Sequence, residues 1–341
     1  MKQLYVVWLA FQRRPASMQS YFGYELEFLP SASTRRFVRF LGYLAKGWKT
    51  LVLFWREQPQ VIWLQLAPTP LLYIAHLYKA LFNRQVKIIA DCHNSMLRAP
   101  WIKFPKTVDL LNGCDVLLVH NDTVKEQAVA VGVNNKNLYV LEDRATLLDC
   151  ETTQKQTPFP KPWILFPCAF NTDEPIEVVL ATARLIPDIT LVITGNSARA
   201  RGRHDLSNLP PNVKLPGFLP KEEFDMLLCS TDAVLGLTIW EGVQLSTANE
   251  AVGTGKPLIL SNTKLLKQLF YKGAVYVDSL NPESLAQGCK EAILRKNELS
   301  QEIIELREDR DRRWLEQAEK VAASLNRMEA DISEKKLDSS T

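Results

Sequence analysis

The stretch AVLGLTIWEGVQLSTANEAVGTGKPLILS, residues 233–261, decides the fold. It opens with the apolar run AVLGLTI and closes with the apolar run KPLILS, and both are typical of strands buried on two faces. The residues between them predict a helix that begins near Ser246 or Thr247 and ends at Gly253 or Gly255. Two buried strands joined by a helix indicate a parallel sheet.

The same alternation runs along the whole chain, with a break at the polar, proline-rich segment 149–162. We therefore predict an α/β fold made of two Rossmann-like, doubly wound domains that face a cleft. The expected parts are an N-terminal domain (1–150), a C-terminal domain (151–310), a helix crossing back towards the first domain (311–330) and a disordered tail (331–341). The predicted strands are 4–11, 24–30, 61–67, 86–92, 115–120, 138–143, 163–170, 189–195, 213–218, 233–239, 256–261 and 274–278.

Composition excludes several classes of protein. The 341 residues are 46% hydrophobic and 23% charged, with a net charge of +3, which is too small to indicate a nucleic-acid-binding protein. The six cysteines form no C-x-x-C pair, and several lie in apolar runs, so we expect buried, reduced thiols. The N-terminal run reads as a strand more readily than as a signal peptide, and no run is long enough to cross a membrane.

Two glutamates flank the predicted helix start. The free backbone N–H groups there, with the helix dipole, favour a phosphate or diphosphate. Glu241 before the turn can accept sugar hydroxyls, and Glu250 inside the helix can accept the hydroxyls of a ribose. A nucleotide-sugar fits this arrangement. A simple capping box from Thr247 to Glu250 fits the same residues.

The stretch resembles the signature of GT-B-fold glycosyltransferases, in particular the bacterial glycosyltransferase family 4, also called glycosyl transferases group 1. Its typical run is EGFGLPxLEAMACGxPVI, which Glu241-Gly242, Glu250-Ala251 and Gly255-Lys256-Pro257 match. The runs ITLVITGN, VKLPGFLPKEEFDMLL and DRRWLEQAEKVAASL resemble further family segments.

The resemblance implies a donor site in the second domain. It implies that Glu241 touches the transferred sugar and Glu250 the ribose. No DxD-like motif stands where a diphosphate-bound metal would need it, so we predict metal independence and no cofactor. The remaining donor-binding residues that it implies are Gly195, Phe218, Leu219, Gly242, Val243, Gln244, Leu245, Ser246 and Thr247.

The sequence departs from the family pattern at two points. Eight residues separate the glutamates, where the family has seven. The family's Arg and Lys after the first strand of the second domain are absent, and Thr172-Asp173-Glu174 stands there instead. That segment and Leu141-Glu142-Asp143-Arg144 resemble the β-1,4-mannosyltransferases of lipid-linked oligosaccharide synthesis, which leaves retaining and inverting transfer both open.

Another group must therefore offset the charge of the donor. Arg199, Arg201 and Arg203 follow Gly195 on a basic loop, and arginine suits bidentate phosphate contact. We predict Arg199 and Arg201 as donor-binding residues, and a solvated loop is the alternative.

The first domain should supply the acceptor site and any catalytic base. His93 follows a predicted strand, in the place where the family often carries a histidine beside the donor, and can bind the sugar or accept a proton. Asp91 is the alternative base, or a structural residue, and His120 is a lesser candidate. Arg13 and Arg14 can meet an anionic acceptor or form a solvated turn.

Segment 34–59 is basic, aromatic and amphipathic, as helices that lie on a membrane surface are. Alternatively, its aromatic residues pack onto the sheet and its cations are simply solvated.

The predicted function is transfer of a sugar from a nucleotide-sugar to a lipid-linked or polysaccharide acceptor. The resemblance places this reaction in envelope, exopolysaccharide or glycolipid synthesis at the cytoplasmic face of the membrane. A sugar-nucleotide epimerase on the same fold and a non-catalytic binding subunit are the alternatives.

Overall fold

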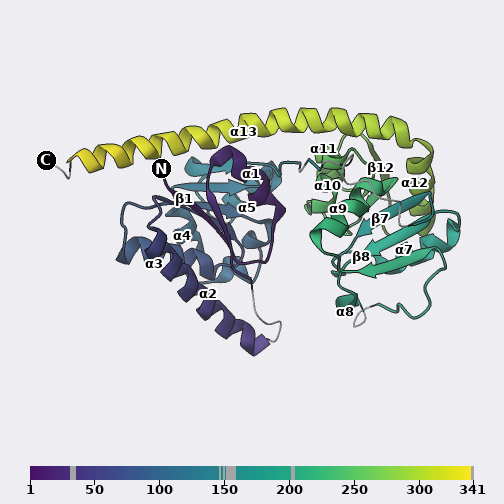
Figure 1. Cartoon of the computed structure of the whole chain (residues 1–341), viewed down its shortest axis with the longest axis horizontal. Helices are drawn as coiled ribbons and strands as arrows, with labels where there is room; N and C mark the ends of the chain where they lie inside the picture. The colour runs from purple at the N-terminus through teal and green to yellow at the C-terminus, as the bar shows by residue number, and fades with distance from the viewer. Residues whose placement is uncertain (31–35, 146, 149, 151–158, 201–203, 339–341) are drawn as a thin grey trace. The chain divides into compact units, whose positions relative to one another are not determined.

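The structure of the chain is a computed structural model that describes residues 1–30, 36–145, 147–148, 150, 159–200 and 204–338 (Figure 1). It divides into two compact units. Unit 1 comprises Met1–Arg144 and Arg313–Thr341, and unit 2 comprises Ala145–Arg312. Each unit contains one six-stranded sheet, and every strand pairing in both sheets is parallel.

The sheet of unit 1 has the strand order β2-β1-β3-β4-β5-β6. Its first five strands in this order reproduce the doubly wound 2-1-3-4-5 arrangement. All six strands predicted from the apolar runs are confirmed. Their bounds are β1 (Gln3–Val7), β2 (Glu25–Phe28), β3 (Val61–Leu66), β4 (Lys87–Cys92), β5 (Val116–Val119) and β6 (Leu138–Val140).

Helices cover both faces of this sheet (Figure 1). Side chains alternate between the faces along each strand, so Leu4 and Val6 pack with Phe54 and Leu72 in one core, whereas Tyr5 packs in the other. The helical elements are α1 (Arg13–Phe22), α2 (Arg36–Glu57), α3 (Pro70–Leu81), η1 (Asn94–Leu97), η2 (Trp101–Lys103), α4 (Thr107–Asn112), α5 (Asp122–Ala130) and η3 (Asn135–Asn137).

The sheet of unit 2 has the order β12-β11-β10-β7-β8-β9, which is the Rossmann order 3-2-1-4-5-6 read from the other edge. Its six predicted strands are also confirmed. The strands are β7 (Trp163–Pro167), β8 (Thr190–Thr194), β9 (Val213–Gly217), β10 (Ala233–Gly236), β11 (Leu258–Ser261) and β12 (Ala274–Val277). The helices are α7 (Ile176–Leu185), α8 (Ser197–Ala200), α9 (Lys221–Ser230), α10 (Ser246–Thr254), α11 (Lys264–Leu269) and α12 (Pro282–Leu294).

The last helix, α13 (Lys296–Asp338), belongs to both units. Ile303 and Leu306 are buried in a core of unit 2, and Trp314 and Val321 are buried in a core of unit 1. The helix extends to Asp338, through most of the segment that the composition predicts as a disordered tail; residues 339–341 lie outside the described part of the chain.

One expectation about the cysteines is wrong. Cys150 and Cys229 form a disulfide, with the Cα atoms 5.1 Å apart. Nothing in the spacing of these two residues, which are 79 positions apart, indicates the pair. The other four, Cys92, Cys114, Cys168 and Cys289, are free and buried as expected.

None of the helices among the described residues combines the length and the apolar character that crossing a lipid bilayer requires.

Candidate functional site

The strand order of unit 2 reverses between β7 and β10. At such a switch point the loops leaving the two central strands separate, and a crevice opens at the carboxyl ends of the strands. The loops that follow β7, β8, β9 and β10 all lie at this edge because the strands are parallel. The predicted donor-binding residues come from these loops and from the start of α10.

The turn after β10 leads into α10 as predicted. The helix begins at Ser246, after Leu245 in extended conformation, and no side chain caps it in the described structure. Thr247 therefore lies inside the helix and is not its cap, so a capping box does not explain the Thr247–Glu250 pattern. Glu250 lies in the second turn and is half-buried.

Glu241 is exposed, and its carboxylate faces the start of α11. The backbone N–H of Lys264 donates to its Oε2 at 3.2 Å and to its Oε1 at 3.4 Å. Gly242 follows with φ of 73°, a conformation in which glycine is favoured. The residues from Gly242 to Leu245 are half-buried and connect the carboxyl end of β10 to α10.

Gly195 draws the ends of three strands together. Its N–H donates to the carbonyl oxygen of Gly217, at the end of β9, at 2.9 Å. Its φ is 135°, and a Cβ atom at this position would lie 1.9 Å from the carbonyl oxygen of Cys168, just after β7. Only glycine fits here, because any side chain would collide with the backbone just after β7.

Large apolar side chains are exposed at this same edge. Phe218, just after β9, is 82% exposed, and Ile239 and Trp240, after β10, are 43% and 47% exposed. Leu219 is half-buried and packs against a core of unit 2. Exposed aromatic rings beside backbone-lined loops provide a surface on which a nucleobase can stack.

Two acidic residues of the loop after β7, Asp173 and Glu174, fix its conformation by hydrogen bonds. Glu174 accepts hydrogen bonds from the N–H groups of Ala169, at 3.0 Å, and Asn171, at 2.7 Å. Burial raises the pKa of Glu174 despite these two bonds. The nearly buried Asp173 accepts a hydrogen bond from the hydroxyl of Thr238, at 2.8 Å, which ties the loops after β7 and β10 together.

The predicted arginines are only partly described. Arg199 is exposed on the short helix α8, directly after the Gly195 turn. Arg201 and Arg203 lie outside the described residues.

Unit 1 has a second group of polar residues, at the carboxyl ends of three neighbouring strands. Asp91 lies in β4 with His93 just after it, His120 follows β5, and Asp143 follows β6. Arg14, in α1, reaches into the group. The fold brings together Arg14 and Asp143, which are 129 positions apart in the sequence.

Arg14 is the centre of this network. Its Nε donates to both oxygens of Asp91, at 2.8 and 3.1 Å, and its Nη1 donates to Asp143 at 2.8 Å. Its Nη2 donates to the carbonyl oxygen of Leu141 at 2.9 Å. Arg14 is 5% exposed, so its guanidinium is held by the protein itself, whereas Arg13 is half-buried. The hydroxyl of Tyr5 also donates to Asp91, at 2.7 Å.

Burial and charge fix the protonation states in the network. Burial lowers the pKa of His120 to about 4, and Arg14 adds to the shift although both aspartates oppose it. Burial opposes ionisation of Asp143, but His120 and Arg14 lower its pKa to about 2. Because His120 is itself neutral above pH 4, Arg14 is the cation that stabilises Asp143 at neutral pH. Burial likewise opposes ionisation of Asp91, and Arg14 outweighs it, so the pKa of Asp91 is lowered.

His93 lies at the rim of the network. Its ring packs edge-on against that of His120, with the centroids 5.4 Å apart, and its Nδ1 lies 3.2 Å from the hydroxyl of Ser95. The N–H of Ser95 also points to Nδ1, at 3.4 Å, so His93 caps η1. Burial lowers the pKa of His93, and its imidazole is neutral at physiological pH. A neutral imidazole can bind a hydroxyl or accept a proton.

Three members of this region are not among the predicted site residues. Asp143 and Tyr5 belong to the network, and Gln65 lies in β3 opposite Asp91 in the strand register. Gln65 is 5% exposed, and its Oε1 is buried without a hydrogen-bond partner among the described residues. A buried acceptor without a partner is rare and costly, which marks a polar position at the edge of the site. The mannosyltransferase-like segment 141–144 is the signal in the sequence that points to Asp143.

Among the described residues, no group of three His, Cys, Asp or Glu side chains is arranged to hold a metal ion.

Two parallel Rossmann-type units joined by one chain are the architecture of the GT-B glycosyltransferases, and solved structures with this fold match nearly the whole chain. Sucrose-phosphate synthase from Thermosynechococcus elongatus aligns with a TM-score of 0.73 at 12% identity, over 97% of this chain and 100% of that one. HepE from Anabaena, solved with UDP and glucose, aligns with a TM-score of 0.67 at 12% identity, over 96% and 99%. A glycosyltransferase from Rickettsia africae aligns with a TM-score of 0.60 at 16% identity, over 90% and 92%.

Residues 151–310 match the family model of glycosyl transferases group 1. The match covers unit 2 and identifies this unit as a glycosyltransferase domain of that family. No curated protein matches the chain by sequence.

Proposed function

We propose that the chain transfers a hexosyl group from a nucleoside diphosphate sugar, of the UDP-glucose type, to a lipid-linked or polysaccharide acceptor in envelope, exopolysaccharide or glycolipid synthesis. The family match of unit 2 supports transfer from a nucleotide-sugar. HepE, solved in complex with UDP-glucose, supports UDP-glucose as the first donor to test. A cytoplasmic enzyme placed at the inner face of the membrane would meet such an acceptor.

The observation that carries the proposal is the start of α10. The helix begins without a side-chain cap in the described structure, beside the switch point of a Rossmann sheet. Its first amides and its dipole favour the diphosphate. We assign the backbone from Gly242 to Thr247 to the diphosphate and Glu250 to the ribose.

We assign the remaining donor-binding residues from their positions in unit 2. Phe218 and Leu219 receive the base beside Gly195, and Arg199, with Arg201, neutralises the diphosphate. The loop after β7, where the family resemblance implies an Arg and a Lys, is closed here by Glu174. The proposal therefore places the neutralising charge on the loop after β8.

Unit 1 supplies the remaining groups. We assign His93 to sugar binding or to proton acceptance, and within unit 2 we assign Glu241 to sugar binding. Asp91 is bound by Arg14 and Tyr5, which favours a positioning role over that of a base. Of the two predicted acceptor residues, Arg13 is the better candidate because Arg14 is enclosed.

A thermal-shift experiment tests this function. We expect UDP and UDP-glucose to raise the melting temperature of unit 2 without added metal and in the presence of EDTA. Stabilisation by a ligand at one hundred times its Kd is about 2.7 kcal/mol, which corresponds to several degrees. Glu250→Gln should lose most of this stabilisation.

Glu283→Gln, an exposed glutamate in the first turn of α12, is the matched control and should keep it. If no nucleoside diphosphate stabilises the wild-type chain, the non-catalytic alternative is favoured and the proposed function fails.

A further inference from the structure

One side of α2 presents apolar side chains to solvent. Leu44, Trp48, Val52 and Trp55 are 59%, 68%, 42% and 61% exposed. Steps of four, four and three residues keep them within one stripe along three turns of the helix. Phe54, on the opposite side, is fully buried against the sheet. The helix therefore has two apolar sides, one that packs on the core and one, the stripe, that is exposed to solvent.

The neighbouring helix α3, which packs against α2, extends this surface. Leu81 is 65% exposed and Phe82, directly after the helix, is 52% exposed. Trp55 and Phe82 line the same surface pocket of about 370 Å³. We call the surface formed by Leu44, Trp48, Val52, Trp55, Leu81 and Phe82 the α2–α3 face.

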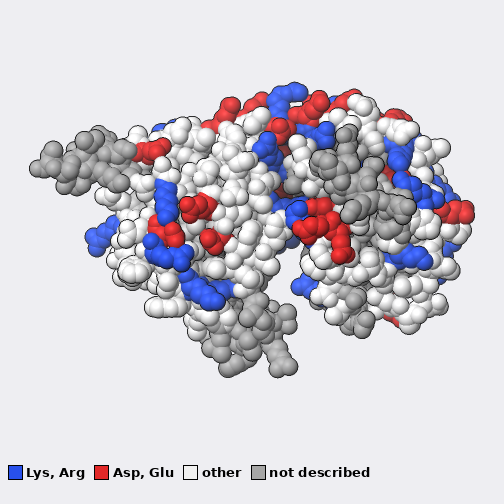
Figure 2. All heavy atoms as spheres, viewed as in Figure 1, with Lys and Arg blue, Asp and Glu red and all other residues white. Residues whose placement is uncertain are grey.

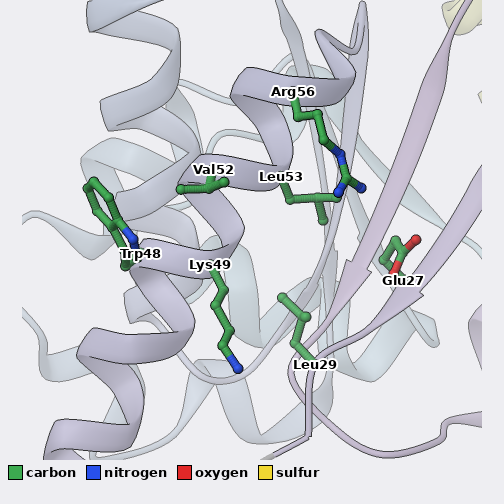
Figure 3. Close-up of a pocket in the computed structure, with 7 residues that line it drawn as sticks. All are labelled: Glu27, Leu29, Trp48, Lys49, Val52, Leu53 and Arg56. Carbon is green, nitrogen blue, oxygen red and sulfur yellow. The ribbon is translucent and has the colours of Figure 1, made fainter.

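Cations border the stripe. Lys49 and Arg56 line a second pocket, of about 310 Å³, together with Trp48 and Val52 (Figure 3). In Figure 2, Lys and Arg side chains gather where Figure 1 places α2, with a few acidic side chains nearby.

The charge of this region is strongly one-sided. Residues 36–87 contain eight Lys or Arg and a single acid, Glu57, which is a net charge of +7 in a chain whose total is only +3. The rest of the chain is therefore net negative. The nearby carboxylates are Glu57, which pairs with Lys2 and Arg56 at 2.7 Å, and Glu27 of β2, which lines the pocket with Lys49. Asp115 pairs with Lys79 at 3.1 Å and with Lys87 at 3.2 Å, and Lys46 is buried, so the cations that border the stripe are Lys49 and Arg56.

We propose that the α2–α3 face docks onto an anionic lipid surface. The inference deepens the proposed function, because it names the surface that would bring the enzyme to a lipid-linked acceptor. Exposed tryptophans with neighbouring cations on one helix face are the features of interfacial helices. A second copy of the chain is a poorer occupant, since a two-fold contact through this face would oppose like charges.

Co-flotation with vesicles tests the inference. We expect the wild-type chain to bind vesicles of phosphatidylglycerol and phosphatidylcholine in equal amounts more strongly than pure phosphatidylcholine. The double substitution Trp48→Ala, Trp55→Ala should reduce binding on the order of tenfold. Lys49→Glu should reduce it several-fold on anionic vesicles and not on neutral ones.

Two variants of α12 are the matched controls. Leu294→Ala removes an apolar side chain that is 87% exposed, and Lys290→Glu reverses an exposed helical lysine. Both should bind vesicles as the wild type does. Equal binding by the double variant and the wild type overturns the inference, and so does the absence of wild-type binding. Concentration-dependent dimerisation that the double substitution abolishes, without vesicle binding, assigns the face to a second copy instead.

The two proposals fail separately. Stabilisation by UDP without vesicle binding leaves the proposed function intact and removes the docking face. Vesicle binding without stabilisation by any nucleoside diphosphate removes the function and leaves a lipid-binding face.

Discussion

Arg14 shows what a single residue does in this chain. It donates to the buried carboxylate of Asp91, the half-buried carboxylate of Asp143 and the carbonyl oxygen of Leu141, and these partners follow it by 77, 129 and 127 positions. Removing its charge would leave the buried carboxylate of Asp91 without its cation, which typically costs about 3–5 kcal/mol. The sequence places Arg14 at a turn, and only the folded sheet reveals that it is structural.

His120 provides a prediction about pH. Its folded pKa of about 4 lies below the ordinary value of 6.5, so the unfolded chain binds the proton more tightly. Its contribution to stability is therefore complete above pH 6.5 and is lost as the pH falls to about 4. The total is about 3 kcal/mol. His93 shifts in the same direction.

Urea unfolding at pH 7.5 and pH 4.5 measures this effect. His120→Gln should show a smaller loss of unfolding free energy between the two values than the wild type. Gln287→Ala, at an exposed and non-titrating position of α12, should keep the wild-type loss. An unchanged pH dependence in His120→Gln would show that the imidazole is not buried in its neutral form.

At the scale of the elements, apolar runs predict the strands well and their ends less well. All twelve predicted strands exist, yet AVLGLTI extends to residue 239 whereas β10 ends at Gly236. Leu237 and Thr238 stay buried after the ladder stops, because the N–H of Thr238 bonds to Ser261 and its hydroxyl to Asp173. A hydrophobic pattern therefore predicts which residues are buried, and it overestimates the length of a strand where buried residues continue beyond the paired ones.

Some features of the candidate site could be predicted from the sequence and others could not. The start of α10 is local: the sequence predicts it near Ser246 or Thr247, and the helix begins at Ser246. The ion network, the partner of Glu241 and the disulfide depend on residues 23 to 129 positions apart, with no spacing rule that connects them. Short-range patterns therefore predict the helix start, and only the assembled sheets reveal the long-range contacts.

Reducing the disulfide measures how much the link between Cys150 and α9 stabilises unit 2. The bond joins Cys150 to the end of α9, across 79 positions within unit 2. Closing a loop of this length typically stabilises by about 2–4 kcal/mol. We expect dithiothreitol to lower the unfolding free energy of the wild type by this amount and to have no effect on Cys150→Ala.

Thiol titration in denaturant checks the pairing directly. The structure predicts four reactive thiols without reductant and six after reduction. Six thiols without reductant would contradict the disulfide.

At the scale of the whole molecule, α13 is the element that contributes residues to both units. Trp314 is 1% exposed and packs edge-on against Tyr21, with the ring centroids 5.1 Å apart. The guanidinium of Arg144 lies 4.7 Å from the centroid of the Trp314 ring. This part of the helix thus completes a core of unit 1, although the chain has already passed through unit 2.

Trp314→Ala should therefore destabilise unit 1 and leave donor binding by unit 2 intact. A buried tryptophan replaced by alanine typically costs about 3–5 kcal/mol. Calorimetry with UDP should show the nucleotide-dependent transition unchanged and the other transition lowered. Leu315→Ala, at the partly exposed neighbouring position, should cost less than about 1 kcal/mol. Equal shifts of both transitions would show that the units unfold as one.

The continuity of α13 also limits how this gene can change in length. One residue inserted between Leu306 and Trp314 would rotate every later side chain by about 100° about the helix axis. Trp314, Ala318 and Val321 would then leave the side that they now bury. Insertions and deletions should accumulate in the loops, while the number of residues between Leu306 and Trp314 stays constant in descendants that keep both cores.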